Sequence, residues 1–303
     1  MLARRRVAMK RIASIEKKRL GAIYLAFGTP YLAMSLVSAF TLRKYNPEVR
    51  IHIVTNLPET IKDELTFWDA ESDIWYYVES DDQSNRQYKT SIVDYSACER
   101  MVYLDSDTLL TGPLDVAWRL LDHFDVCLRA QQNRQTHKNL AQTEILKGGI
   151  RLMDCPQWNG GVFFFRNNNT VRDLFLDWNR NFNDIDEKFD QPALAKTIIE
   201  SVCRVLSLDE RWNGGFKIVD DDKGGYPIVA HYHSALDSVI EGQLRKVASQ
   251  IDPHVKGNAS DAVEAYISRC RAIHNRSVKG SLKWRLRRAY RRCWHKKLNL
   301  FEL

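Results

Sequence analysis

Two aspartates one residue apart, Asp105 and Asp107, follow the apolar residues 101–104, and apolar residues resume at Leu109. This is the pattern of a buried strand whose carboxyl end delivers two carboxylates to a cleft. Neighbouring carboxylates repel each other, and a divalent cation is the commonest reason to place them together. Hard oxygen ligands of this kind suit Mg²⁺ or Mn²⁺, which in turn bind phosphates. The stretch therefore predicts a metal-dependent enzyme that acts on a phosphate-containing substrate.

Cationic and imidazole side chains occur on either side of this pair. Arg86 and Lys89 precede it on a predicted helix and share one helix face, where they could contact phosphate or simply form a solvated basic surface. His231 and His233 follow a short predicted strand, and alternation points both rings to the same side. A neutral imidazole there could complete a metal shell, and a purely structural role is the equal alternative.

Two short motifs later in the chain also bear on a ligand site. Asn159, Gly160 and Gly161 precede an apolar segment, which indicates either a close backbone approach to a ligand or an ordinary turn. The run Asp190, Gln191 and Pro192 opens a predicted helix. Local evidence alone favours a plain N-cap for this aspartate, with proline in the first turn.

Alternating strands and helices must position these residues. Residues 21–27 predict a strand, Gly28 a turn, and residues 31–45 an amphipathic helix. Further strands are expected at 50–55, 74–78, 101–105, 124–130, 162–166, 205–208 and 228–231, and helices at 58–65, 82–96, 114–121, 171–182, 193–202, 235–250 and 259–274. This alternation predicts an α/β fold with a mostly parallel sheet flanked by helices. Ligands of such sheets bind beyond the carboxyl ends of the strands, so Gly28 and Asp105 are expected to face one crevice.

The composition is that of an ordinary globular protein, with 44% hydrophobic and 27% charged residues in 303. Its six cysteines are widely spaced and form no C-x-x-C pair, which disfavours a zinc site or disulfide framework and favours a reducing compartment. The net charge of +7 is uneven, because residues 4–19 and 281–297 together carry +15 and the remainder nets −8. An acidic body with basic ends is unlike a nucleic-acid-binding domain, so no nucleic-acid partner is expected.

Two segments raise the question of a membrane. Residues 21–42 lack charged side chains, but Pro30 and several polar residues favour a buried strand, turn and helix over a signal peptide or membrane anchor. Residues 281–297 predict a basic amphipathic helix that could lie on an anionic membrane surface. We expect a basic leader at 1–20, a catalytic domain at 21–234 and a helical appendage at 235–303. The predicted location is cytoplasmic, with peripheral attachment to the inner face of the membrane.

The order of these signatures over residues 21–233 resembles the GT-A fold nucleotide-sugar glycosyltransferases, and most nearly glycosyltransferase family 8. The signatures are the first strand with its glycine turn, Arg-x-x-Lys, Tyr-Leu-Asp-Ser-Asp-Thr, Asn-Gly-Gly-Val, Asp-Gln-Pro and a late histidine. The resemblance implies a GT-A fold and Mn²⁺ or Mg²⁺ as cofactor. It also implies transfer of a sugar, with retention of configuration, from a nucleoside diphosphate donor, expected to be a UDP-sugar, to a glycan or lipid-linked acceptor.

The resemblance also implies roles for individual residues. The metal ligands would be Asp105, Asp107 and His231, with His233 as the alternative third ligand, and the catalytic pair near the reacting carbon would be Asp190 and Gln191. The donor would contact Ala26, Phe27, Gly28, Thr29, Arg86, Lys89, Ser106, Asn159 and Gly160. The chain departs from the family after the histidine, where residues 232–235 replace a Gly-x-Lys-Pro-Trp-like run and its diphosphate-binding lysine.

Two other functions are compatible with parts of the sequence. The run at 102–108 also fits the apolar-Asp-x-Asp-x-Thr signature of HAD-type phosphatases, with Asp105 as nucleophile and the acidic run 219–222 as a later motif. That hypothesis gives no role to Asn-Gly-Gly or Asp-Gln-Pro. The basic ends alone would also suit a membrane-surface adaptor without enzymatic activity.

Overall fold

The computed structural model describes residues 19–65, 73–79, 85–131, 145–146, 148–185, 190–215, 227–232, 236, 238–254 and 259–278. Four features of the sequence lie outside the described residues: the basic leader up to residue 18, the acidic run 219–222, His233 and the basic segment 281–297. Predictions that concern them stay predictions.

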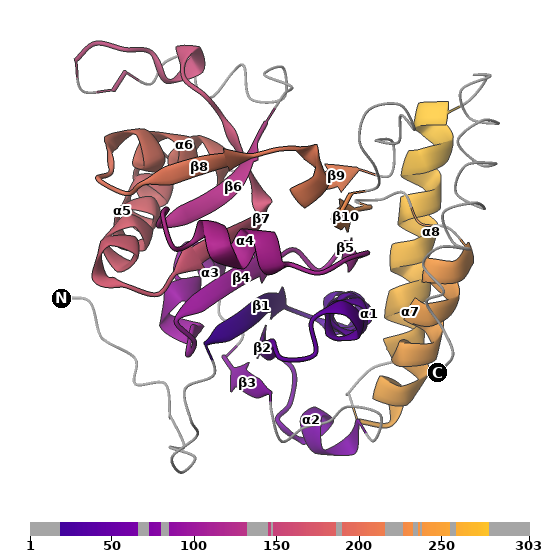
Figure 1. The fold of residues 1–303 in the computed structure, drawn as a ribbon. Coiled ribbons are helices and arrows are strands. Elements are labelled where there is room, and N and C mark those ends of the chain that lie inside the picture. Colours follow the sequence, from indigo (N-terminus) through magenta and orange to yellow (C-terminus); the bar gives the residue numbers. More distant parts are fainter. Residues whose placement is uncertain are drawn as a thin grey trace.

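A seven-stranded sheet with the strand order β3-β2-β1-β4-β7-β6-β8 forms the centre of the fold (Figure 1). Its strands are β1 (Leu20–Ala26), β2 (Arg50–Thr55), β3 (Ile74–Tyr77), β4 (Arg100–Leu104), β6 (Val126–Ala130), β7 (Trp158–Arg166) and β8 (Val205–Leu208). All neighbouring pairs are parallel except that β7 runs antiparallel to both β4 and β6. The predicted α/β fold with a mostly parallel sheet is therefore confirmed.

A second, three-stranded sheet lies beside the carboxyl end of β4. It consists of β5 (Thr108–Leu110), β10 (Val229–His231) and β9 (Gly214–Gly215), in the order β5-β10-β9. In the antiparallel pairing of β5 with β10, Thr108 lies opposite His231. This small sheet therefore brings the late histidine next to the Asp-x-Asp segment that precedes β5.

Helices cover both faces of the large sheet, and the alternation of β1 defines the two faces. Tyr24 belongs to the apolar core that includes residues of α1, α4, α7 and α8, whereas Ile23 and Leu25 belong to the core that includes α5 and α6. The helices are α1 (Thr29–Tyr45), α2 (Thr60–Glu64), α3 (Asn85–Lys89), α4 (Asp115–Leu120), α5 (Asn169–Ile185), α6 (Gln191–Glu200), α7 (Ser238–Ile251) and α8 (Ala259–Val278).

Helix α1 is buried on nearly every side, which corrects its prediction as an amphipathic helix. Ten of its residues between Leu32 and Leu42 are buried. The reason is that α1 packs between the sheet on one side and α7 and α8 on the other, as Figure 1 shows. This double cover explains the absence of charge at 21–42. Among the described helices, none is long and apolar enough to cross a membrane.

Two elements near the predicted site differ from the sequence prediction. Instead of one helix at 82–96, α3 ends at Lys89 and a separate 3₁₀ helix, η1, covers Ile92–Tyr95. The hydroxyls of Thr90 and Ser91 donate to the carbonyls of Gln87 and Tyr88, and such local bonds compete with helix continuation. Strand β7 begins at Trp158, four residues earlier than expected, so the Asn-Gly-Gly motif lies within a strand.

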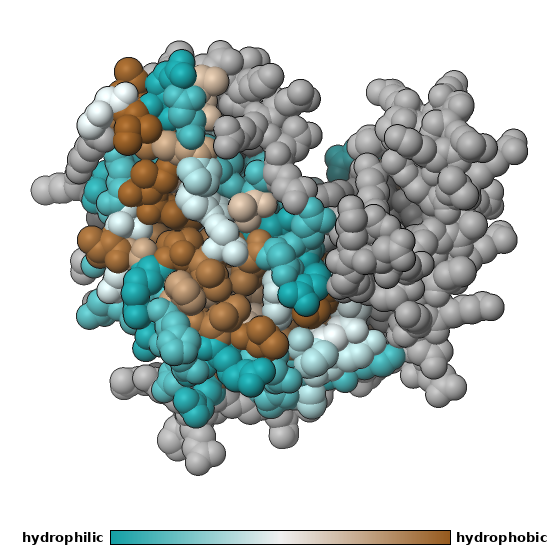
Figure 2. Space-filling view, turned by 45° about the horizontal axis from the view of Figure 1, so that its top comes forward, coloured by the Kyte–Doolittle hydropathy of each residue, from teal (hydrophilic) through white to brown (hydrophobic). Residues whose placement is uncertain are grey.

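The surface carries apolar side chains in a broad patch with hydrophilic residues along its border (Figure 2). Among the exposed large apolar side chains are Ile145, Ile150 and Val202. Ile145 pairs with Arg151 in an isolated antiparallel bridge, and Ile150 is next to Arg151 in the chain.

Candidate metal and donor site

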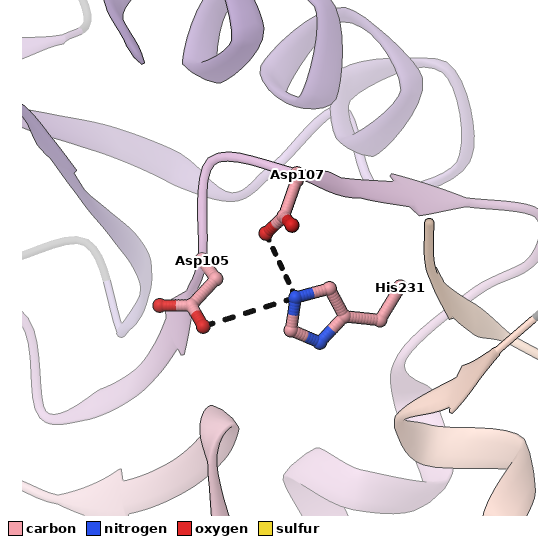
Figure 3. A group of neighbouring side chains, drawn as sticks. All are labelled: Asp105, Asp107 and His231. Carbon is pink, nitrogen blue, oxygen red and sulfur yellow. Dashed lines mark hydrogen bonds and ion pairs between the residues drawn. The ribbon is translucent and has the colours of Figure 1, made fainter. Parts of the chain in front are cut away.

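Asp105, Asp107 and His231 form a cluster whose ligand atoms all lie within 4.8 Å of one another (Figure 3). The Nε2 atom of His231 lies 2.7 Å from Oδ1 of Asp107 and 3.8 Å from Oδ2 of Asp105. The histidine is buried, whereas both aspartates are partly exposed. The three residues predicted as metal ligands are therefore brought together with their oxygen and nitrogen atoms converging on one point.

Backbone pairing fixes the positions of the two aspartates. The backbone amide of Asp105 donates to the carbonyl of Gly161 on β7 at 2.8 Å, and the backbone amide of Tyr232 donates to the carbonyl of Asp107 at 3.0 Å. The first bond ties the segment to the large sheet and the second to the small sheet. The turn between the two sheets therefore presents both carboxylates at the carboxyl edge of β4, as the strand pattern predicted.

Hydroxyl groups of α1 form hydrogen bonds with the turn that carries Asp105 and Asp107. Ser35 donates to the hydroxyl of Ser106 at 2.9 Å, and Ser106 donates to the carbonyl of Leu25 at 3.1 Å. The hydroxyls of Ser38 and Thr108 lie 2.9 Å apart, and both are buried. The structure thus places Ser106, which the family resemblance assigned to the donor, in a network that supports the metal-ligand turn.

The two oxygens of Asp105 have different surroundings. Its Oδ1 accepts from the hydroxyl of Tyr103 at 2.7 Å and from Nζ of Lys89 at 3.0 Å. Within the described part of the chain, no hydrogen bond reaches Oδ2, the oxygen that faces His231. Tyr103 and Lys89 therefore orient the carboxylate so that Oδ2 faces His231, a role for Tyr103 that the sequence pattern did not predict.

Burial and charge act in opposite directions on the cationic groups of the site. Burial by itself would lower the pKa of His231, but the charge and hydrogen bond of Asp107 and the charge of Asp105 outweigh it, so the pKa is raised. The pKa of Lys89 is likewise raised, because Asp105 and Asp190 more than offset its burial. The neighbouring carboxylates therefore favour the protonated form of both groups, and a cation bound at His231 would compete with its proton.

Asp190 occupies the N-cap position of α6, but its side chain does not cap the helix. Its side chain makes no capping hydrogen bond, and Oδ2 instead lies 3.6 Å from Nζ of Lys89. Asp190 is 5% exposed, and its Oδ2 has no hydrogen-bond partner among the described residues. The local preference for a plain cap is therefore wrong. Lys89 links this carboxylate to Asp105, so the predicted catalytic residue joins the same cluster.

The two glycines of the Asn-Gly-Gly motif face different parts of the site. A Cβ added to Gly161 would lie 2.6 Å from Cε1 of His231 and 2.7 Å from Oδ2 of Asp105, far too close for either. A Cβ added to Gly160 would meet Oδ2 of Asp190 at 3.4 Å, an ordinary contact. The backbone at Gly161 therefore closely approaches the side chains of His231 and Asp105, whereas the predicted approach of this motif to a bound ligand stays a prediction.

The loop predicted to hold the nucleotide base follows β1 at the same edge of the sheet. Ala26 is buried at the end of β1, Gly28 has φ 79°, and Thr29 begins α1. The amide of Gly28 donates to Oδ1 of Asn56 at 2.8 Å, and the rings of Phe27 and Tyr88 are in edge contact with their centroids 4.7 Å apart. Asn56, which follows β2, was not anticipated as the residue that fixes this loop.

Other predicted donor contacts are less closely joined to the cluster. Arg86 is exposed on α3, while Lys89 on the same helix is buried, so the two do not share one environment. Asn159 accepts the amide of Gly161 at 2.8 Å through Oδ1, and Gln191 is half-buried in the first turn of α6. Their roles toward a donor stay predictions.

A cavity of about 670 Å³ lies elsewhere, at the amino ends of β1 and β4. It is lined by Arg19, Leu20, Arg100, Asp115, Trp118, Arg119 and Asp122. The metal-ligand cluster lies at the opposite, carboxyl ends of these strands, so this cavity is not part of the site.

The chain resembles solved glycosyltransferase structures, although no family model and no curated protein match its sequence. The glycosyltransferase GlyE of Streptococcus pneumoniae is 13% identical with a TM-score of 0.53, over 84% of this chain and 64% of GlyE, so the chain spans under two thirds of that protein. The galactosyltransferase LgtC, solved with donor and acceptor sugar analogues, is 14% identical with a TM-score of 0.51, over 88% of this chain and 100% of LgtC. The bifunctional glycosyltransferase WbbM is 11% identical with a TM-score of 0.54, over 84% of this chain and 53% of WbbM.

The chain therefore has the GT-A fold of glycosyltransferases. LgtC belongs to glycosyltransferase family 8, and the predicted resemblance to GT-A glycosyltransferases of that kind is confirmed at the level of the fold.

Proposed function

We propose that this protein is a metal-dependent glycosyltransferase that moves a sugar from a nucleoside diphosphate donor, expected to be a UDP-sugar, to a glycan or lipid-linked acceptor. One observation carries the proposal: the three-residue cluster of Asp105, Asp107 and His231 lies at the carboxyl edge of β4 in a GT-A fold. Ligands of open α/β sheets bind at such edges. The family resemblance of the sequence adds retention of the anomeric configuration.

The residues at this edge fit a divalent cation. Two carboxylates and one imidazole offer oxygen and nitrogen donors that suit Mn²⁺ or Mg²⁺. Oδ2 of Asp105, which no hydrogen bond reaches among the described residues, is a further sign of fit. When bound, the cation would supply Lewis-acid stabilisation of the charge on a departing diphosphate.

Lys89 and Asp190 would position the reacting groups beside the cation. Lys89 holds Oδ1 of Asp105 and lies 3.6 Å from Asp190, so it keeps the metal carboxylate and the candidate catalytic carboxylate at a fixed separation. Asp190 would then orient the sugar or the attacking hydroxyl through Oδ2, the oxygen that lacks a hydrogen bond from the described residues. The predicted contact of Lys89 with the diphosphate stays a prediction, and its contacts with Asp105 and Asp190 support a positioning role besides.

A donor-hydrolysis screen with Mn²⁺ across UDP-, GDP- and other nucleotide sugars tests this function. The purified protein should release the nucleoside diphosphate from one donor class, EDTA should stop the release, and Asp105→Asn should abolish it. Asp122→Asn serves as the control, because Asp122 pairs with Arg100 on the exposed surface near the opposite end of β4. Hydrolysis of a phosphate ester that Asp105→Asn abolishes, with no binding of any nucleotide sugar, would overturn the proposal.

We also propose that the basic segment 281–297, which lies outside the described residues, places the enzyme on an anionic membrane surface beside its acceptor. Its eight Lys/Arg residues and lack of acidic residues support attraction to anionic lipid. Flotation with phosphatidylserine liposomes should recover the full chain but not a variant ending at residue 280. Equal recovery of both proteins would remove this part of the proposal.

A further inference from the structure

The two ring nitrogens of His231 face different partners. Nε2 is directed at the carboxylates, 2.7 Å from Oδ1 of Asp107, while Nδ1 lies 3.0 Å from Oδ1 of Asn213. The imidazole is 4% exposed and Asn213 is 2% exposed, so both contacts are shielded from water. Asn213 is therefore the residue beside the ring nitrogen that points away from the metal-ligand cluster.

The backbone around Asn213 holds this amide in place. Asn213 lies between the 3₁₀ helix η4 (Glu210–Trp212) and β9, and the next residue, Gly214, pairs with Ala230 next to His231 on β10. A Cβ on Gly214 would lie 2.5 Å from the carbonyl oxygen of Glu210, so the tight turn requires glycine. The carbonyl of Asn213 also accepts a hydrogen bond from the guanidinium of Arg129. Asn213 and His231 are thus fixed relative to each other by two adjacent strands.

We propose that Asn213 is a positioning residue whose Oδ1 accepts the Nδ1 proton of His231, so that the Nε2 lone pair is directed at a divalent cation between Asp105 and Asp107. The neutral imidazole ring carries one proton, and the hydrogen bond made by one nitrogen decides which nitrogen is free to bind a metal. Partners of this kind orient the ring and increase its basicity as a ligand. The inference rests on the proposed metal-dependent function.

The opposite orientation of the amide makes the opposite prediction. Were the amide of Asn213 reversed, Nδ2 would donate to Nδ1 of His231, and the neutral ring would carry its proton on Nε2 against Asp107. No lone pair would then face the carboxylates. Aspartate at this position can only accept a hydrogen bond when ionised, so Asn213→Asp separates the two arrangements.

The test measures the Mn²⁺ dissociation constant of the full chain, by electron paramagnetic resonance of free Mn²⁺, alongside thermal unfolding in EDTA. We expect Asn213→Ala to weaken Mn²⁺ binding about 10–100-fold, the usual effect of removing such a partner. Asn213→Asp should bind within roughly threefold of the unsubstituted chain, or more tightly, because the acceptor is kept. Asn167→Ala is the matched control, because this partly buried amide bonds to Ser96 and Arg172 away from the site.

Two-bond ¹H–¹⁵N correlation of histidine-labelled protein with Mg²⁺ gives a second, direct measurement. The signals of His231, assigned by their loss in His231→Ala, should show a proton on Nδ1 and none on Nε2. Asn213→Asp should keep this tautomer. A proton on Nε2 in the Mg²⁺-bound chain would overturn the proposal, and so would loss of Mn²⁺ binding in Asn213→Asp as large as in Asn213→Ala.

The variant Asp107→Asn separates failure of this inference from failure of the proposed function. If Asp107→Asn leaves Mn²⁺ binding unchanged, the metal site itself is wrong, and Asn213 loses its proposed role with it. If Asp107→Asn weakens binding but Asn213→Ala changes only the unfolding temperature, the metal site stands and Asn213 is structural.

Discussion

Two clusters of charged side chains in this molecule differ in the ratio of carboxylates to cationic groups. The site cluster comprises Asp105, Asp107, Asp190, Lys89 and His231, and the helix-pair cluster comprises Glu241, Arg245, Glu264 and Arg271. In the helix-pair cluster two carboxylates meet two guanidiniums, with Arg271 bidentate to Glu241 and Arg245 bidentate to Glu264. In the site cluster three carboxylates converge on one lysine and one histidine.

The difference indicates what each cluster is for. The helix-pair cluster joins α7 to α8 with matched charges in two bidentate pairs, an arrangement in which ion pairs stabilise structure. The site cluster crowds carboxylates together and leaves Oδ2 of Asp190 without a hydrogen bond from the described residues. Such an excess of negative charge does not help the chain to fold, and it marks a place where a cation is expected to bind.

Asp107→Asn should remove function without removing stability. It deletes one carboxylate of the cluster, so Mn²⁺-dependent turnover should fall by on the order of 10³-fold. In EDTA the unfolding temperature should change little, because the loss of one like charge and the loss of the charged contact with His231 act in opposite directions. Donor turnover and calorimetry of the same samples measure both. Retention of Mn²⁺-dependent turnover within tenfold of the unsubstituted chain would place the metal elsewhere.

Gly161→Ala and Gly160→Ala form a matched pair of single-methyl additions on one strand. The new methyl at Gly161 would lie 2.6 Å from His231 and must displace a metal ligand, so turnover should fall by on the order of 10²-fold. The methyl at Gly160 meets Asp190 at an ordinary 3.4 Å, and turnover should change by less than about tenfold. Steady-state kinetics at saturating Mn²⁺ compares the two, and equal losses would show that the approach to the metal ligands is not what requires glycine.

Glu241→Gln should have the reverse effect to Asp107→Asn. Glu241 is 5% exposed and contacts both Arg245 and Arg271, so its neutralisation should lower the free energy of unfolding by roughly 2 kcal/mol. Turnover per folded molecule should not change. Denaturant titration and kinetics at a temperature where both proteins are folded make the comparison. A loss of turnover with unchanged stability would mean that the helix pair takes part in the reaction.

Glu264→Gln should give the smallest effect, visible as a change in pH dependence. The hydrogen bonds and charge of Arg245 lower the pKa of Glu264 below its ordinary value. The pair therefore stabilises the fold above the unfolded-state pKa, and this contribution is lost as pH falls through the folded-state pKa. Because Glu264 is half exposed, the loss should be under about 1 kcal/mol. Unfolding followed between pH 6 and pH 3 should show a shallower decline in the variant, and an identical slope would exclude this contribution.

Much of the fold and the core of the site could be predicted from the sequence, because both depend on local patterns. Strand periodicity placed the Asp-x-Asp segment at the end of β4. The family resemblance offered His231 or His233 as the third ligand, and the structure places His231 beside Asp107. The prediction that α1 is amphipathic was wrong. Its outer face is buried by α7 and α8, and this packing between segments far apart in the chain has no local sequence signal. Asp190 does occupy the N-cap position of α6, but the prediction that its side chain caps the helix was wrong, since Lys89 of α3 lies beside that carboxylate.

The supporting residues carry little local signal. In the sequence, Tyr103 is one more residue of an apolar strand. Only the structure shows that its hydroxyl donates to Asp105 and orients that carboxylate. Asn213 lies 18 residues before the histidine it contacts, in a short turn with no recognisable spacing. Gly161 was visible as part of a motif, but the sequence could not tell which of the two glycines faces the metal ligands.

The pairing of β5 with β10 has a consequence for how the protein is made. His231 meets Asp107 across 124 residues of chain, and this pairing is what joins them. Both aspartates leave the ribosome long before the histidine does, so a nascent chain holds only two of the three ligands. If the proposed cation binds, its loading would therefore wait for the completed fold, and a chain cut anywhere between β5 and β10 would be expected not to bind it.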